Sequence, residues 1–256
     1  YGLQLGEGFI IITGDIGTGK TTLSRALINT LHQENIVAAQ LVTTQLEADD
    51  LLWAVASAFG LQCEGLEKAQ VLRRLEDFMM ARAREGKRLL LVVDECQNLP
   101  PRSLEELRML SNFQVGEKAL MQSFLLGQGE FQLTLRSTGM EQFRQRVIAS
   151  YHLGPLEEDE TINYIKHRLN LVGWQDDPHI TEDAFSAIYE YSAGVPRRIN
   201  NLCDRLLLYG CLEETHEFTR ETVDFVVEEQ RQEIPELDKI ELTKESAETS
   251  SEEPPA

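Results

Sequence analysis

One stretch decides the fold of this chain: Phe9-Ile10-Ile11-Ile12-Thr13-Gly14-Asp15-Ile16-Gly17-Thr18-Gly19-Lys20-Thr21-Thr22. Its first five residues are apolar or β-branched, which is typical of a buried strand. A glycine-rich turn follows, and from Lys20 to Leu31 apolar residues recur at helical spacing. We therefore predict a strand, a tight loop and a helix in direct succession.

The turn fits the pattern G-x-x-x-x-G-K-[ST], and it lies between a strand and a helix, as a phosphate-binding loop requires. Backbone N–H groups can surround a phosphate there, and the helix N-terminus adds positive potential. We expect Lys20 to contact the β- and γ-phosphates of ATP and the Thr21 hydroxyl to bind Mg²⁺. A plain glycine turn before a helix is the alternative interpretation. The residues expected to bind the nucleotide are Gly14, Asp15, Ile16, Gly17, Thr18, Gly19, Lys20, Thr21 and Thr22.

A second signal is the run at residues 89–93, which is apolar at every position, as expected of a strand covered on both faces. Asp94 and Glu95 follow it directly. In a parallel sheet such carboxylates lie at the carboxyl edge, beside the phosphate loop. We expect Asp94 to hold a magnesium-bound water and Glu95 to orient and polarise the attacking water. The alternative is a strand that simply leaves the core at two acidic residues.

Strands and helices alternate up to residue 153, which predicts an α/β fold with a parallel sheet between helices. A helix is expected after Pro101, with Ser103 as its N-cap. From residue 157 every segment reads as helix, so we expect a core at 1–155, a helical lid at 156–230 and a disordered acidic tail at 231–256. The further predicted strands are 37–42, 122–126 and 147–153; the further helices are 47–59, 68–84, 159–172, 181–192, 197–211 and 219–229.

Composition limits the classes of function. The formal net charge is −19, and so acidic a surface repels phosphate backbones, so we expect no general nucleic-acid binding. No apolar stretch approaches the roughly 20 residues needed to cross a bilayer, so a membrane role would come through a partner.

The four cysteines form no Cys-x-x-Cys pair, which favours a reducing cytoplasm over a zinc site or disulfide bonds. The chain opens at Tyr1 without a leader-like segment, which we interpret as a missing N-terminal segment.

Together these motifs resemble the AAA+ ATPases of general secretion pathways and, more closely, the secretion ATPase of bacterial PEP-CTERM/exosortase exopolysaccharide systems. The similar stretches are residues 8–22, 37–50, 90–114, 122–156 and 194–207, and they include phrases longer than a nucleotide motif needs, such as those at 105–113 and 144–153. Asp94-Glu95-Cys96-Gln97 looks like the DEAQ form of the acidic motif, with cysteine in place of alanine. Gly129 departs from the family, which commonly has proline there.

The resemblance implies roles for further residues. Arg197, in Gly194-Val195-Pro196-Arg197, matches the start of a sensor 2 helix, although capping a helix start is an alternative. Arg146, with Arg144 as second choice, precedes the last core strand, where AAA+ proteins present an arginine finger to a neighbouring subunit. Surface salt bridges are the alternative for both arginines. Gln128 follows the fourth strand, at the place of sensor 1.

The resulting hypothesis is a cytoplasmic AAA+ ATPase that forms a homo-oligomer and couples ATP hydrolysis to envelope export or polysaccharide biosynthesis machinery, where a partner could recruit it to the inner membrane. One alternative is a DNA-handling ATPase of the transposition-accessory type. Another is a regulatory switch that binds ATP and scarcely hydrolyses it.

Charge gives a first test between these hypotheses. Because the chain is strongly acidic, we expect fluorescence anisotropy to detect no binding of labelled duplex DNA at physiological salt, with or without Mg·ATP. DNA affinity that falls steeply as salt rises would contradict this expectation and support the DNA-handling alternative.

Overall fold

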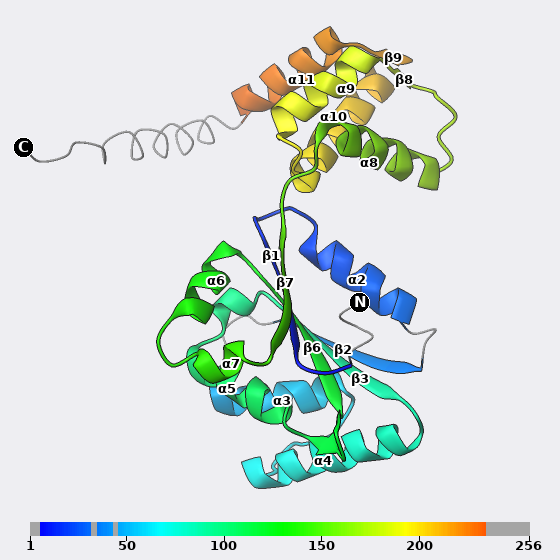
Figure 1. Cartoon of the computed structure of the whole chain (residues 1–256). Coiled ribbons are helices and arrows are strands. Elements are labelled where there is room, and N and C mark those ends of the chain that lie inside the picture. Colours follow the sequence, from blue (N-terminus) through cyan, green and yellow to red (C-terminus); the bar gives the residue numbers. More distant parts are fainter. Residues whose placement is uncertain (1–5, 32–34, 43–45, 234–256) are drawn as a thin grey trace, which may run out of the picture. The chain divides into compact units, whose positions relative to one another are not determined.

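The computed structural model describes residues 6–31, 35–42 and 46–233 (Figure 1). The chain divides into two compact units between Gly154 and Pro155, and each unit has its own hydrophobic core. In the described part of the chain, no helix combines the length and the apolar character needed to cross a membrane.

The first unit is built on five parallel strands in the order β2-β3-β6-β1-β7. Because β6 pairs with both β1 and β3, the carboxyl ends of these three strands are neighbours. Every strand predicted from an apolar run is present, with bounds that differ by at most one residue at each end. The bounds are β1 (Phe9–Gly14), β2 (Ile36–Val42), β3 (Arg88–Asp94), β6 (Met121–Gly127) and β7 (Val147–Leu153).

Helices cover both faces of this sheet. Successive strand residues point to opposite sides, and apolar residues on each side pack against helices. Phe9 and Ile11 pack in the core formed with α3 to α7, whereas Ile10 and Ile12 pack with Leu27 of α2. Figure 1 shows α2 on one face of the sheet and α3 to α7 on the other. The predicted sandwich of helices around a parallel sheet is thus confirmed. The helices are α2 (Lys20–Leu31), α3 (Ala48–Ala58), α4 (Lys68–Arg84), α5 (Pro101–Leu110), α6 (Gly129–Arg136) and α7 (Glu141–Arg144).

Three features of the first unit differ from the prediction. Ser103 is not an N-cap, because α5 begins at Pro101, and the Ser103 hydroxyl instead donates a 2.9 Å hydrogen bond to the carbonyl of Leu46. Proline suits the first helical position, where its missing N–H costs nothing. The short helices α6 and α7 were not predicted, and neither was a hairpin of β4 (Gln114–Val115) and β5 (Lys118–Ala119), because none is long enough to show a clear period.

The second unit is mostly helical. It also contains a pair of two-residue parallel strands, β8 (His179–Ile180) and β9 (Glu217–Phe218), which the prediction of helices alone missed. The last helix continues past the expected start of the tail at residue 231, and the Arg231 guanidinium lies 5.9 Å from the centre of the Tyr191 ring. Residues 234–256, where we expected disorder, lie outside the described residues. The helices are α8 (Glu158–Leu171), α9 (Glu182–Ser192), α10 (Pro196–Leu212) and α11 (Arg220–Glu233).

A glycine makes the connection between α9 and α10 possible. Gly194 has a φ of +69°, and a Cβ added to it would lie 1.9 Å from the carbonyl oxygen of Leu156. The Leu156 N–H also donates a 2.9 Å hydrogen bond to the carbonyl of Gly194. The two backbone segments therefore approach too closely for any side chain at this position.

We expect Gly194→Ala to lower the free energy of unfolding of this unit by about 2–4 kcal/mol, because it adds a backbone clash to the cost of a left-handed residue. Gly173→Ala is the matched control: its φ is +85° but nothing lies within 4 Å of an added Cβ. The control should lose only about 1 kcal/mol. Urea unfolding followed by circular dichroism measures both, and equal losses would contradict the assigned clash.

Candidate active site

The predicted phosphate loop joins β1 to α2 and is held open by glycines. A Cβ on Gly14 would lie 2.5 Å from the carbonyl oxygen of Leu153, so the end of β7 requires glycine there. Gly17 and Gly19 have φ values of +88° and +94°, which favour glycine. The backbone N–H and the hydroxyl of Thr18 both donate to the carbonyl of Asp15, which closes the turn. This turn directs the chain into the N-terminus of α2, where unpaired N–H groups favour an anion.

Lys20 is the first residue of α2, and its side chain folds back under the loop. Its Nζ donates to the carbonyls of Gly14 and Asp15 at 2.7 and 2.8 Å, and the residue is buried. Burial lowers the pKa of the Lys20 ammonium, and the carboxylates of Glu95 and Asp94 act in the opposite direction. An ammonium so removed from water interacts more strongly with a phosphate than an exposed one does.

Thr21 and Asp94 connect the phosphate loop to the end of β3. The Thr21 hydroxyl donates a 2.8 Å hydrogen bond to Oδ2 of Asp94, whose side chain is buried. A hydroxyl and a carboxylate are hard oxygen donors, which suit Mg²⁺. Within the described ranges no cluster of three or more His, Cys, Asp or Glu residues could hold a metal by itself. The site therefore fits Mg²⁺, which usually takes few protein ligands and completes its shell with phosphate oxygens and water.

The other predicted nucleotide-binding residues lie around this centre. Asp15 and Ile16 are exposed on the outer turn of the loop, and Thr22 is exposed on the first turn of α2.

Glu95 follows Asp94 and is held by two amide side chains. It has a left-handed backbone, with φ 56° and ψ 41°. Nε2 of Gln97 donates to its Oε2 at 2.5 Å, and Nε2 of Gln128 lies 3.4 Å from the same oxygen. Gln128 reaches it because β6, which Gln128 follows, lies between β1 and β3. The structure thus brings together Lys20 and Thr21 at the start of α2, Asp94 and Glu95 at the end of β3, and Gln128 after β6.

Sequence analysis missed Gln97 as a member of this group. Its signal was present in Asp94-Glu95-Cys96-Gln97, where only the first two residues were given roles. Cys96, between Glu95 and Gln97, is fully buried, and its thiol donates to the carbonyl of Val93. Burial also raises the pKa of this thiol, so Cys96 is a packing residue. Gly129, the other departure from the family, begins α6 with nothing within 4 Å of an added Cβ, so the loop does not depend on it.

A second polar group that the sequence did not reveal underlies the loop. The hydroxyl of the buried Thr13 accepts a 2.7 Å hydrogen bond from Nε2 of Gln132 and lies 3.1 Å from Nδ1 of His152. This group ties the carboxyl ends of β1 and β7 to α6. His152, which has no metal-ligand spacing in the sequence, is therefore part of the support of the loop.

The predicted finger residues lie at the opposite edge of the sheet. The carbonyl of Arg146 accepts from the N–H of Phe9, the first residue of β1, whereas the phosphate loop begins at Gly14. Nη1 of Arg146 lies 3.3 Å from the carbonyl of Ser111. Arg144 donates to the carbonyls of Leu135 and Ser137 and pairs with Glu141, so it is the more firmly held of the two.

Arg197 belongs to the second unit. It is exposed in the first turn of α10 and makes no side-chain hydrogen bond or ion pair with any residue that the structure describes. Its helix starts at Pro196, so the helix break at residues 194–196 is confirmed while the sensor role stays a prediction.

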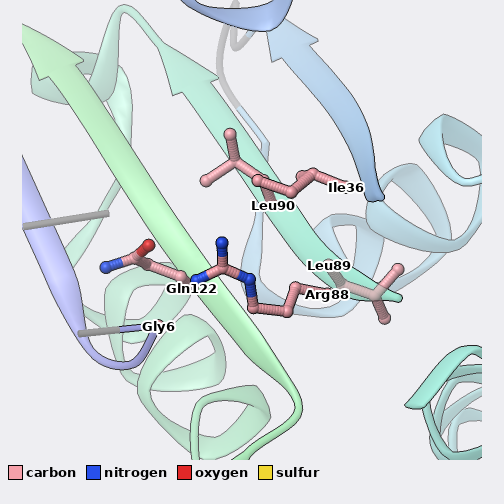
Figure 2. Close-up of a pocket in the computed structure, with 6 residues that line it drawn as sticks. All are labelled: Gly6, Ile36, Arg88, Leu89, Leu90 and Gln122. Atoms are coloured by element: carbon pink, nitrogen blue, oxygen red, sulfur yellow. The ribbon is translucent and has the colours of Figure 1, made fainter. Parts of the chain in front are cut away.

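A small cavity of about 10 Å³ lies at the amino edge of the sheet (Figure 2). Arg88 and Gln122 line it together with Gly6, Ile36, Leu89 and Leu90. It has room for about one water. Because these residues begin β2, β3 and β6, it lies far from the phosphate loop and is not part of the site.

Residues 4–135, about half of the chain, match the family described as AAA domain. The chain belongs to the AAA domain family. This AAA domain protein is 39% identical over 217 residues to General secretion pathway protein A of Aeromonas hydrophila. The alignment covers 84% of the chain but only 39% of that relative, so the chain spans less than half of its length. The resemblance to general secretion ATPases is confirmed at this level, and the PEP-CTERM assignment stays a prediction.

Solved structures of other AAA+ proteins share the fold. The ORC2 protein of Aeropyrum pernix has a TM-score of 0.69 at 16% identity, covering 89% of this chain and 64% of its own. Drosophila ORC bound to DNA has a TM-score of 0.64 at 16% identity, covering 88% and 55%. The Holliday junction branch migration motor RuvB of Thermotoga maritima has a TM-score of 0.53 at 20% identity, covering 86% and 61%. At such identities the likeness concerns the fold alone.

Two substitutions separate binding from turnover at this site. Lys20→Ala is expected to weaken Mg·ATP binding at least about 100-fold, because it removes a buried ammonium. Glu95→Gln should still bind Mg·ATP while turnover falls at least about 100-fold. Calorimetry and phosphate release measure the two effects.

Glu117→Gln, the same change at an exposed hairpin turn, is the control and should leave both quantities unchanged. Normal hydrolysis by the Glu95 variant would remove this carboxylate from the reaction.

Proposed function

We propose that this chain binds and hydrolyses Mg·ATP as an AAA+ ATPase. The observation that carries the proposal is the convergence of Lys20, the Thr21–Asp94 hydrogen bond and Glu95 at the carboxyl ends of β1 and β3, the two strands on either side of β6. An ammonium, a pair of hard oxygen ligands and a separate carboxylate are the groups that phosphoryl transfer to water requires.

Each residue has a distinct task in this proposal. Lys20 exchanges its two carbonyl partners for β- and γ-phosphate oxygens, and the loop amides orient the triphosphate. Thr21 and Asp94 would hold Mg²⁺, which would supply charge neutralisation at the phosphate oxygens. Glu95 orients a water and accepts its proton as the water attacks. Gln128, close to Glu95 at the end of β6, stands near the reacting end of the nucleotide.

Arg146 requires a second copy of the chain. Five residue steps of β1, or about 17 Å, separate its position from the phosphate loop of the same copy. That span is too long for one side chain, so the arginine can stabilise developing charge only on a nucleotide held by a neighbour. The site is therefore complete only in a homo-oligomer, with Arg197 of the lid as a further candidate contact to the γ-phosphate.

We propose further that turnover drives the assembly or operation of a bacterial export system of the envelope. Support comes from the similarity to General secretion pathway protein A, over a part of that protein. The resemblance to PEP-CTERM systems makes exopolysaccharide export the proposed branch. The ATPase would act in the cytoplasm, with a partner recruiting it to the inner membrane.

An experiment that mixes two inactive variants tests ATP hydrolysis at sites shared between copies of the chain. Arg146→Ala should bind Mg·ATP normally but lose turnover about 1,000-fold, because it cannot stabilise charge on the neighbour's nucleotide. Mixing it with Lys20→Ala should restore part of the phosphate release, since one variant supplies intact nucleotide sites and the other supplies intact arginines. Turnover per chain of the unmodified protein should also rise with protein concentration.

Arg73→Ala, at an exposed position of α4, is the matched control and should retain full activity. A mixture no more active than its two components would count against action between copies. Slow turnover that is independent of concentration would favour the ATP-gated switch.

A further inference from the structure

The side chain of Gln97 joins two parts of the site. It lies in the short 3₁₀ turn Cys96–Asn98, directly after the acidic end of β3. Its Nε2 donates to Oε2 of Glu95 at 2.5 Å, and its Oε1 accepts from the backbone N–H of Gln128 at 3.0 Å. One amide thus connects the carboxylate of Glu95 to Gln128, the N-cap residue of α6.

The fold leaves a specific space for this amide. A Cβ on Gly127 would lie 3.3 Å from Oε1 of Gln97 and 3.0 Å from Cβ of Phe131. Phe131 is fully buried in the core and cannot move aside. Glycine at the last position of β6 therefore lets Gln97 approach the strand end closely enough to bond to Gln128.

Glu95 is restrained at both its backbone and its side chain. Its left-handed backbone is held by a 3.0 Å hydrogen bond from its N–H to Oδ1 of Asp94, but its side chain has three rotatable bonds. The contact from Gln128 to Oε2, at 3.4 Å, is at the long end for a hydrogen bond, whereas that from Gln97 is short. Gln97 therefore contributes the stronger restraint on the carboxylate.

We propose that Gln97 is a positioning residue, which holds the carboxylate of Glu95 beside Gln128 in the orientation used to align the attacking water. The inference rests on the proposed function, because that function gives Glu95 its water. A displacement of about 1 Å of a reacting group costs on the order of 100-fold in rate. Among the described residues the side chain of Gln97 makes its hydrogen bonds to Glu95 and Gln128 and none to the phosphate loop, so we expect nucleotide binding not to depend on it.

Gln97→Met tests the proposal, because methionine has a similar length but neither donates to Glu95 nor accepts well from Gln128. We expect kcat to fall about 10- to 100-fold while KM for ATP changes less than about twofold. Gln122→Met is the matched control: Gln122 is a buried amide on β6 that donates to the carbonyl of Glu7, at the amino edge (Figure 2). Its kcat should equal that of the unmodified protein.

Gln97→Glu separates positioning of Glu95 from support of α6. The glutamate keeps an oxygen that can accept from Gln128, but it places a second carboxylate where Glu95 now receives a donor. We expect it to lose as much kcat as Gln97→Met. Full activity of Gln97→Glu would overturn the proposal, because a link to α6 alone would then explain the residue.

A double variant separates this inference from the proposed function. In a Glu95→Gln background, Gln97→Met should change the residual rate by less than about twofold, because the group that it positions is gone. If the unmodified chain hydrolyses ATP, Glu95→Gln does not, and Gln97→Met keeps the full kcat, only the role of Gln97 is wrong. If the unmodified chain does not turn over Mg·ATP, the proposed function itself fails.

Discussion

The position of β6 between β1 and β3 is the constraint on which the rest of the site depends. Parallel strands end at one edge of a sheet, so this order places the phosphate loop, Gln128 and the Asp94–Glu95 pair side by side. The hydrogen bond from Thr21 to Asp94 then connects α2 to β3 across the end of β6. If β1 and β3 were at opposite ends of the sheet, the same residues would lie at the same edge without being in reach of one another.

The length of the strands also separates the phosphate loop from Arg146. The carboxyl edge of the sheet gathers the groups that we propose to hold a nucleotide and its water, and its amino edge carries Arg146 beside the start of β1. If Arg146 takes part in the reaction that we propose, its place at the opposite edge means that it acts on the nucleotide of another copy. This division explains why an arginine so far from its own phosphate loop can still belong to the reaction that we propose.

Sequence analysis succeeded where the signal is local. The runs at residues 9–13 and 89–93 are apolar or β-branched throughout because they are buried on both faces, and each proved to be a central strand. The prediction of Ser103 as an N-cap was wrong because its hydroxyl has a long-range partner, the carbonyl of Leu46, which no capping pattern reveals. Strands β8 and β9 have two residues each and no period of their own, so only the pairing of residues 38 positions apart in sequence defines them.

The sequence by itself determined the fold class, the phosphate loop and the acidic end of β3, because each depends on residues that are adjacent in the chain. Only the tertiary structure decided that Gln97 and Gln128 donate to the same oxygen of Glu95 and that Gly127 makes room for the side chain of Gln97. It also decided that Arg146 lies at the far edge of the sheet. These relations depend on which strands are neighbours and on distances within a few tenths of an ångström, and they arise only when distant segments pack together.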